Sequence, residues 1–544
     1  MTLFLLERTL GDALTSLVGS VTVTPRVLAA DLIVLAPVAP VETTPSVRAR
    51  TSAPPAPLER VVVTGTATGG AQRSLSVAVG VVDGRDLEAQ AQGDLGAFVS
   101  GTVPGIWMWH QSPTSLLARY GSIRGASSFG LSYPKIYIDG IEVANPLVVA
   151  QMPAESVERL EVLRGPQGAA LYGTDAISGV IHVITRQPSN VSDAPGLRTR
   201  AQGGVVTSVF SESGAFGQEV MIAGQRGDIA RSAAATLGVS RLGAFVPEGE
   251  SQSISASARA RAIGRNSIID ATVRVVAADV ASSSNPIVLD AIGETISLPD
   301  TLRRDGSVRR LNFIRDSLAA RFDLDRAARQ SLRQFTGGVS ATVHPSARWT
   351  HRGTIGLDTY TLDGSVGSVT PLPSSADSAL RAAEGSAARV SARLTSAATW
   401  STDAWQHTLT VSGEHAVLRE ATTNAELARP GQPTDNTAET EVWRQTSGLV
   451  TQVDAAWRAS FFITAGARVE RSAGFVAEPL VTLLPMFGLS HVREFADLTV
   501  KVRGAYGKGI RPPRTTVGGV SLARSRLLPN ADLEPEEQTG IEFG

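Results

Sequence analysis

The C-terminal part of this sequence predicts an antiparallel β-sheet, and two observations favour a transmembrane β-barrel. From about Arg198 onward, segment after segment alternates between apolar and polar residues with a period of two, over about 340 residues without a helical interruption. The polar faces of these segments are rich in Arg, Asp and Glu, as a water-filled barrel interior permits. A soluble β-sandwich alternates in the same way, so the pattern alone leaves that alternative open.

The alternation is clearest in Ser253–Ala262, where Ile254 shares one face with alanines while Arg259 and Arg261 share the other with serines. Polar stretches such as Asp363–Asp377 and Thr422–Glu439 separate the alternating segments and are expected to be loops. Other segments with this period are Asp270–Val275, Leu318–Asp325, Arg389–Thr395, His407–Glu414 and Gly466–Glu470.

Composition narrows the class of protein further. Of the 544 residues 42% are hydrophobic. No run reaches ~18 apolar residues, so no transmembrane helix is expected. The net charge of −1 gives no global attraction to nucleic acid, and the absence of cysteine excludes disulfides and thiolate metal sites. Aromatic residues make up only 5%, so an interfacial aromatic girdle would be thin.

The N-terminal part is organised differently. Thr9–Pro37 is expected to be a small αβ fragment, because three leucines have helical spacing and Leu32–Leu35 suits a short buried strand. Val41–Leu58 is rich in Pro, Thr and Ser and is expected to be a linker. Residues 67–188 mix short strands, helices and glycine turns, which predicts a compact αβ domain.

Residues 100–186 carry an ordered series of short motifs. IYIDGI is expected to be a strand that ends in a tight Asp-Gly turn, and GVIHVIT is a β-branched strand. The series is VPGI (Val103–Ile106), IRGA (Ile123–Ala126), IYIDGI (Ile136–Ile141), VERLEVLRGPQG (Val157–Gly168), ALYG (Ala170–Gly173) and GVIHVITR (Gly179–Arg186). In this order the motifs resemble the plug domain of TonB-dependent outer-membrane receptors over most of Val61–Arg186.

Three later segments resemble barrel strands of the same family more loosely: Phe462–Arg471, Gly504–Pro513 and Leu533–Gly544. The resemblance implies an antiparallel transmembrane β-barrel over residues 197–544, with an N-terminal α+β plug domain, residues 67–188, inside its lumen. The family usually has Asn where His182 stands. No second histidine lies near it in the sequence, so a structural role is the simpler interpretation than a metal site.

Residues 59–66 are similar to the TonB box, the segment that pairs with periplasmic TonB. Arg60, Val61, Val62, Val63 and Thr64 are the expected TonB-binding residues, because an unpaired valine-rich strand suits β-strand addition. The alternative is that this segment is simply the first strand of the plug.

The resemblance also implies where a ligand binds, namely at the plug apices that follow the PG-containing strand and the IDG hairpin. Two indoles there offer stacking surface for an aromatic or sugar ligand, although residues 107 and 109 share one strand face and could instead pack against the wall. The candidate ligand-binding residues are Trp107, Trp109, His110, Gln111, Tyr120, Asn145 and Gln151.

A plug–barrel lock is the third expected site. Arg124 and Arg164 match plug arginines that face barrel glutamates in the family. Strand alternation turns Glu470 and Glu542 inward, and a guanidinium enclosed by a barrel needs a partner, so these four residues are the expected lock. The alternative is that the arginines bind the plug's own carbonyl groups or its acidic residues.

Both ends of the sequence are expected to be incomplete. Residues 1–40 weakly resemble the end of a periplasmic signalling domain of the secretin and TonB N-terminal type, and Met1–Leu6 lacks the basic region of an export signal. We therefore expect the true start to lie upstream. The family barrel has ~22 strands, whereas about fifteen are expected here, so the barrel is expected to be truncated at its C-terminus.

The family implies energised import across the outer membrane and no enzymatic activity, and the sequence contains no GxSxG, HExxH or P-loop motif. No cofactor or metal is expected. The implied partners are TonB with the ExbB–ExbD complex, outer-membrane lipid, and a small ligand such as a metal chelate, vitamin or glycan, with ferric siderophores the commonest case. The first alternative is a regulatory receptor that also signals to an anti-sigma partner, and the second is a passive porin or adhesin.

Overall fold

The structure is a computed structural model of the 544-residue chain, which divides into two compact units, Met1–Leu58 and Glu59–Gly544. It describes residues 23–29, 32–37, 61–62, 70–84, 86, 99, 102–109, 120–123, 134–146, 152, 156–186, 196–208, 211–228, 230–244, 249–282, 328–366, 381–426, 437–474, 479–495, 498–512, 516–517, 520–521 and 534–544.

The first unit contains one antiparallel pair of strands, β1 (Val23–Ala29) and β2 (Leu32–Pro37). The pairing runs from Val23 opposite Pro37 to Ala29 opposite Leu32, with one irregularity near the turn. The strand expected at Leu32–Leu35 is therefore confirmed. The helix expected from the leucine spacing and the linker at Val41–Leu58 lie outside the described residues.

The second unit begins with the plug, whose main sheet has five strands in the order β5-β10-β11-β8-β9. Only β8 and β11 are parallel, and the Asp-Gly turn at Asp139–Gly140 joins β8 to β9 with positive φ at both residues. The strands are β5 (Val79–Asp83), β8 (Lys135–Ile138), β9 (Ile141–Glu142), β10 (Val157–Arg164) and β11 (Gly179–Thr185), with the short helices η3 (Pro166–Gly168) and α4 (Ala169–Tyr172) between β10 and β11.

Among its described residues, the second unit also contains three two-stranded sheets. They are β3 (Val61–Val62) with β4 (Gly70–Ala71), β6 (Ile106–Trp109) with β7 (Tyr120–Ile123), and β25 (Thr516–Val517) with β26 (Val520–Ser521).

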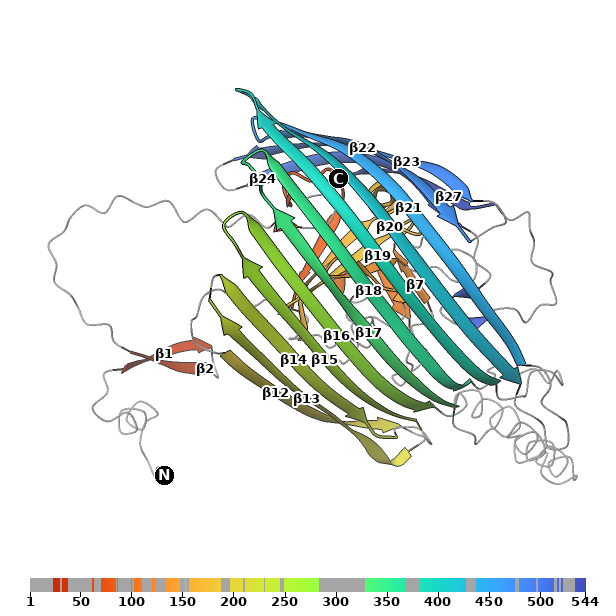
Figure 1. The fold of residues 1–544 in the computed structure, drawn as a ribbon. Coiled ribbons are helices and arrows are strands. Elements are labelled where there is room, and N and C mark those ends of the chain that lie inside the picture. Colours follow the sequence, from red (N-terminus) through yellow and green to blue (C-terminus); the bar gives the residue numbers. More distant parts are fainter. Residues whose placement is uncertain are drawn as a thin grey trace, which may run out of the picture. The chain divides into compact units, whose positions relative to one another are not determined.

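The wall is a 14-stranded antiparallel sheet whose strands follow one another in sequence order, with β12 and β27 at its two edges among the described residues (Figure 1). Its strands are β12 (Gly196–Ser208), β13 (Ser211–Gly227), β14 (Arg231–Leu242), β15 (Glu250–Ile263), β16 (Ser267–Ser282), β17 (Ala328–Val343), β18 (Trp349–Val366), β19 (Arg381–Ser401), β20 (Trp405–Glu426), β21 (Thr437–Trp457), β22 (Phe461–Ala473), β23 (Leu480–Glu494), β24 (Thr499–Arg511) and β27 (Glu536–Phe543).

Wall strands such as β15 and β22 alternate between buried or half-buried residues and more exposed ones, as the sequence predicted. On β22, Val469 is exposed on the outer face while Arg468 and Glu470 are buried on the inner face, and Ile254 on β15 is likewise exposed beside buried Ser255. The outer face therefore carries a band of exposed aliphatic side chains that favours contact with lipid. No helix among the described residues is long and apolar enough to cross a membrane.

The strands are longer than expected. A membrane-crossing strand needs only ~9–11 residues, yet β19, β20 and β21 have 21, 22 and 21. The predicted start of the loop Asp363–Asp377 is wrong, because β18 continues to Val366. The predicted start of the loop Thr422–Glu439 is wrong in the same way, because β20 continues to Glu426. Polar residues do not end these strands, because their backbone groups go on pairing with the neighbouring strand beyond the apolar band. The predicted strand Leu318–Asp325 lies outside the described residues.

The two ends of the wall differ. Tight turns join β13 to β14, β15 to β16, β17 to β18, β19 to β20, β21 to β22 and β23 to β24, whereas residues 283–327, 367–380 and 427–436 connect strands at the opposite end. We call these the short-turn end and the long-loop end.

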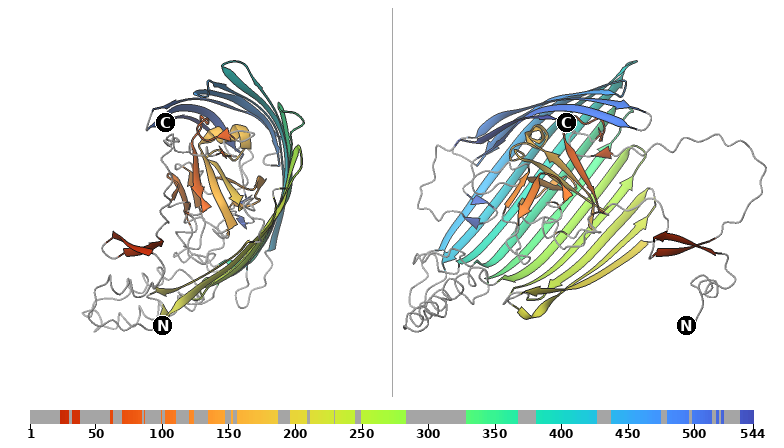
Figure 2. Two further views of the ribbon diagram at one scale, coloured as in Figure 1. Left: turned by 90° about the vertical axis from the view of Figure 1, so that its left-hand side faces the viewer. Right: turned by 180° about the vertical axis from the view of Figure 1, so that it is seen from behind.

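The plug lies on the concave face of the curved wall (Figure 2). Its own core is built from side chains such as Ile123, Leu160 and Val183. A second apolar cluster joins Leu163 and Tyr172 of the plug to Val450, Leu484 and Ile510 of the wall, so plug and wall share part of one core.

Candidate functional site

The plug and the wall meet along a seam of buried polar contacts. Glu142 on β9 lies between two cations, Lys135 of the plug and Arg389 of the wall, at 3.2 and 2.5 Å. The Tyr137 hydroxyl donates to the same carboxylate at 3.3 Å, and Lys135 Nζ also donates to the Tyr172 carbonyl at 2.6 Å. Burial, together with the carboxylates Glu142 and Glu414, raises the pKa of Tyr137 well above its ordinary value, so its hydroxyl stays a donor.

A second cluster centres on Glu414 of β20. Its two oxygens pair with Arg393 of β19 at 3.0 Å and Arg468 of β22 at 3.1 Å. Arg468 also pairs with Glu470 at 2.5 Å, and Glu470 accepts from the plug through the backbone N–H of Thr174 at 3.1 Å and its hydroxyl at 2.5 Å. A chain of charges thus runs across the wall from β19 to β22 and ends on the plug.

Arg393 provides a further link to the plug. Its guanidinium lies over the rings of Tyr137 and Tyr172, 5.5 and 5.7 Å from their centroids. These are cation–π contacts, which hold a cation against an aromatic face without fixing it to one acceptor.

Two aspartates complete the seam. Asp139 of the plug turn pairs with Arg259 of β15 at 3.0 Å and accepts from Thr272 of β16 at 3.2 Å. In the reverse direction, Asp358 of β18 accepts from the backbone N–H of Ala144 in the plug at 2.8 Å, and from Thr336 and Gln334 of the wall.

Glycines of the wall make room for the plug at two places. A Cβ at Gly356 would lie 2.7 Å from Cγ2 of Ile141, and one at Gly338 would lie 2.6 Å from its Cδ1. On β24 and β27, at one edge of the wall, a Cβ at Gly507 would lie 2.5 Å from the backbone of Gln167, and one at Gly540 would lie 2.8 Å from Pro166. No larger residue fits at these positions without moving the plug.

The seam can therefore do two things. Its buried charges are paired, which holds the plug at rest, because removing one partner of a buried pair is costly. The same groups can exchange partners with each other or with entering water, as an apolar interface of the same area could not. The arrangement suits a domain that must stay in place and still be displaced.

The structure describes two of the five expected TonB-binding residues, Val61 and Val62. Val61 and Val62 form β3 and pair with Ala71 and Gly70 of β4, so the segment is extended, as predicted, but paired within the chain. Arg60, Val63 and Thr64 lie outside the described residues. Strand β4 is followed directly by Gln72. The carbonyl of Gln72 accepts a hydrogen bond from Lys501 of β24 at 3.0 Å.

The expected ligand-binding residues are separated by the structure. Trp107 on β6 is 60% exposed. Asn145 is only 1% exposed and interacts with Tyr360 of β18, which places it at the plug–wall seam, and its role in ligand binding stays a prediction. The neighbouring Ala144 is held to β18 by its hydrogen bond to Asp358. For Trp109 and Tyr120 the structure describes only the pairing of their backbones, and His110, Gln111 and Gln151 lie outside the described residues.

The expected lock stays a prediction. Glu470 and Glu542 are buried, and Glu470 does reach the plug, through Thr174. Glu542 accepts from Arg503 on the neighbouring strand at 2.9 Å, and Arg164 Nη1 donates to the carbonyl of Pro104 within the plug at 3.3 Å. Arg124 lies outside the described residues.

Sequence reasoning missed Glu142, Arg389, Arg393, Glu414 and Asp358. Strand alternation was the available signal for the wall residues, since Arg389 and Arg393 lie on one face of a segment already recognised as alternating. What alternation cannot supply is the height of each residue along its strand, which decides which of the inward groups meet.

A plug seated against a curved antiparallel wall, with a charged seam between them, defines the class of plugged β-barrel receptors. The TonB-dependent Receptor Plug Domain profile matches residues 71–180, and the profile of the TonB dependent receptor-like β-barrel matches residues 274–544. The chain belongs to the TonB-dependent receptor family, which is a family of outer-membrane transporters and receptors.

Individual relatives agree with this family. The chain is 30% identical over 131 residues to the vitamin B12 transporter BtuB of Vibrio vulnificus, and 30% identical over 140 residues to the iron-regulated outer membrane virulence protein of Vibrio cholerae. These matches cover 23% and 24% of this chain and 20% of each relative, so the aligned region spans about a fifth of their length.

Among solved structures, the ferric preacinetobactin receptor of Acinetobacter baumannii is similar with a TM-score of 0.64 at 14% identity, over 89% of this chain and 70% of that one. The RagAB peptide importer is similar with a TM-score of 0.64 at 13% identity, over 87% of this chain and 65% of that one. At these identities the likeness concerns the fold alone.

Proposed function

We propose that this protein is an outer-membrane transporter that imports a scarce ligand when TonB, powered by ExbB–ExbD, displaces the plug. The observation that carries the proposal is the path of the chain from β3 to the seam. A pull on Val61–Val62 acts through β4 on Gln72, which Lys501 holds to the wall, and then on the rest of the plug. In bacterial barrels the short turns face the periplasm, and Lys501 lies close to the turn between β23 and β24, so TonB would act from that side.

We propose a ferric siderophore as the ligand class. Two of the similar solved structures are described as siderophore receptors of Acinetobacter baumannii, although a vitamin B12 transporter and a peptide importer are also among the proteins that this chain resembles. Trp107 is an exposed indole on the plug, and we propose that it and Trp109 contact the ligand, with His110, Gln111, Tyr120 and Gln151 near them. A passive porin is less well supported, because a plug fastened by buried ion pairs obstructs free diffusion.

The test of the proposal is Val62→Pro. Proline removes the backbone N–H of Val62 and fixes φ, so a partner strand cannot pair there. We expect uptake of labelled ferric siderophore by whole cells to fall to the level of cells lacking TonB, with cell-surface binding unchanged. Val62→Ile, which keeps the N–H, is expected to transport normally.

A second variant separates pairing with TonB from pairing within the plug. Gly70→Pro disrupts the strand that faces Val62 in this structure but leaves the valine segment intact. It should retain uptake. If Gly70→Pro abolishes uptake as completely as Val62→Pro, or if Val62→Pro transports normally, the segment is not the TonB-binding site.

A further inference from the structure

The segment by which the chain enters the plug, residues 72–79, is fastened to the wall at the short-turn end. Lys501 Nζ donates to the Gln72 carbonyl, and Ser490 donates to the Ser74 carbonyl at 3.3 Å. Arg73 pairs with Glu494, at the end of β23, at 3.0 Å. Gly488 faces Ser76 with no room for a side chain. These contacts are the first that a force on β3 and β4 would meet.

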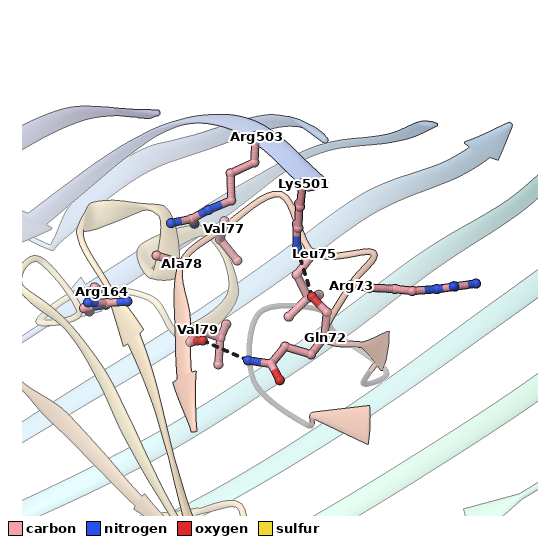
Figure 3. Close-up of a pocket in the computed structure, with 9 residues that line it drawn as sticks. All are labelled: Gln72, Arg73, Leu75, Val77, Ala78, Val79, Arg164, Lys501 and Arg503. Carbon is pink, nitrogen blue, oxygen red and sulfur yellow. Dashed lines mark hydrogen bonds between the residues drawn. The ribbon is translucent and has the colours of Figure 1, made fainter. Parts of the chain in front are cut away.

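A cavity of about 450 Å³ lies beside this segment (Figure 3). All of its ionisable lining groups are basic, and none is a carboxylate. Its lining residues are Gln72, Arg73, Leu75, Val77, Ala78, Val79, Arg164, Lys501 and Arg503. Figure 3 shows Lys501 and Arg503 reaching from β24 toward the entry segment, with Arg164 on the far side, while Arg73 extends away from the other cations.

The two wall cations of the cavity, Lys501 and Arg503, can donate to an acceptor that enters it. Arg503 Nη2 pairs with Glu542, but its buried Nη1 has no acceptor among the described residues. Lys501 carries three N–H groups, and the contact with Gln72 uses one of them. A buried donor such as Arg503 Nη1 is satisfied by an acceptor in nearly all proteins, and cations favour one that is negatively charged.

The size and the lining together indicate the class of ligand. The volume lies within the ~300–1,000 Å³ of ordinary small-molecule sites, so it exceeds what a single inorganic ion fills. Leu75, Val77 and Val79 give one side of the cavity an apolar surface, which suits a carbon skeleton. Lys501 and Arg503 at the wall and Arg164 in the plug would then receive separate acidic groups.

We propose that this cavity binds a small organic polycarboxylate, which bridges the entry segment of the plug and strand β24. A bound polyanion contacts cations from both parts at once, so it holds the entry segment against the wall. The proposal concerns the resting protein and does not depend on which ligand the receptor imports.

The experiment is calorimetric titration of the purified full-length protein with citrate and, separately, with inorganic phosphate at low ionic strength. We expect citrate to bind at one site, more tightly than phosphate, with an affinity that falls as salt is added. The Lys501→Gln, Arg503→Gln double variant should weaken citrate binding at least tenfold. Arg333→Gln, which removes an exposed arginine paired with Asp279 on β16, is the matched control and should bind as the native protein does.

Because Lys501 also binds the Gln72 carbonyl, its replacement could weaken citrate binding by disturbing the fold. A second variant separates these two causes. Val79→Glu leaves both cations and the Gln72 contact in place but puts a carboxylate into the cavity. It should abolish citrate binding while the near-ultraviolet circular dichroism stays native. The proposal is overturned if citrate fails to bind the native protein at millimolar concentration, or if both variants bind it with native affinity.

Discussion

At the scale of single residues, Glu414 is the carboxylate that joins two arginines of the wall within the seam. It lies between Arg393 of β19 and Arg468 of β22 and pairs with both guanidiniums. In Glu414→Ala both guanidiniums lose a partner inside the protein. Breaking a buried pair in this way costs about 3–5 kcal/mol, and we expect the urea midpoint of plug unfolding to fall accordingly.

The control for this experiment is Glu441→Gln. Glu441 pairs with Arg419 at 2.9 Å, but on the exposed outer face near the long-loop end. The same change of charge should leave the midpoint where it was, since solvent screens the pair. Equal losses in Glu414→Ala and Glu441→Gln would show that the seam contributes no special stability.

His182 makes the plug sensitive to pH. Burial, and then the nearby cations led by Arg352, lowers the pKa of His182 to about 3. In the unfolded chain its pKa is about 6.5, so between these values the unfolded state binds a proton that the folded state does not. Stability of the plug must therefore fall as pH decreases from about 6.5 toward 3, by about 1.4 kcal/mol for each pH unit at most.

We predict that His182→Asn removes this component. The variant should lose less stability than the native protein between pH 6.5 and 4.5, measured by urea unfolding at each pH. Carboxylates titrate in both proteins and cancel in the comparison. Parallel pH profiles would mean that His182 is protonated in the folded plug or is already accessible to solvent.

At the scale of elements, strand β18 includes the glycines Gly353 and Gly356, of which only Gly356 contacts the plug. Gly356 faces Ile141 of the plug, whereas a Cβ at Gly353 would meet nothing within 4 Å. We expect Gly356→Val to displace β9 from the wall, since overpacking of this kind costs about 1–3 kcal/mol. Ion leakage through the protein in planar bilayers should rise in Gly356→Val and stay native in Gly353→Val. Native conductance in both variants would show that the wall yields there and the plug does not.

The elements themselves were largely predictable from the sequence, and their contacts were not. The Asp-Gly turn at Asp139–Gly140 and the strand GVIHVIT follow from local propensity, and the inward direction of Glu470 follows from alternation. The pairing of Glu470 with Thr174 does not, because it joins residues 296 positions apart whose relative height depends on every strand between them. The burial of Asn145 against β18 could not be predicted from the sequence for the same reason.

At the scale of the whole molecule, four of the seven tryptophans lie where wall strands end. Trp349, Trp400, Trp405 and Trp457 all lie at the short-turn end. Trp349 stacks on His351 at 5.8 Å, and Trp400 and Trp405 stack on His407 at 5.4 and 5.9 Å. Composition predicted a thin girdle, but it could not show that four neighbouring strands, β18 to β21, bring these rings to one level. Tryptophan and tyrosine prefer the boundary between lipid and water, so this level should mark one edge of the membrane.

That placement can be measured by fluorescence quenching. We expect a variant whose only tryptophan is Trp349, reconstituted in liposomes, to be quenched more strongly by lipids brominated near the headgroup end of the acyl chain than by lipids brominated near the methyl end. A variant that keeps only Trp107, which belongs to the plug on the concave face, should be quenched by neither lipid. The reason is that bromine quenches over short distances and only the outer face of the wall touches lipid. If Trp349 escapes quenching by both lipids, the outer face of the wall does not contact the bilayer and the proposed membrane location fails.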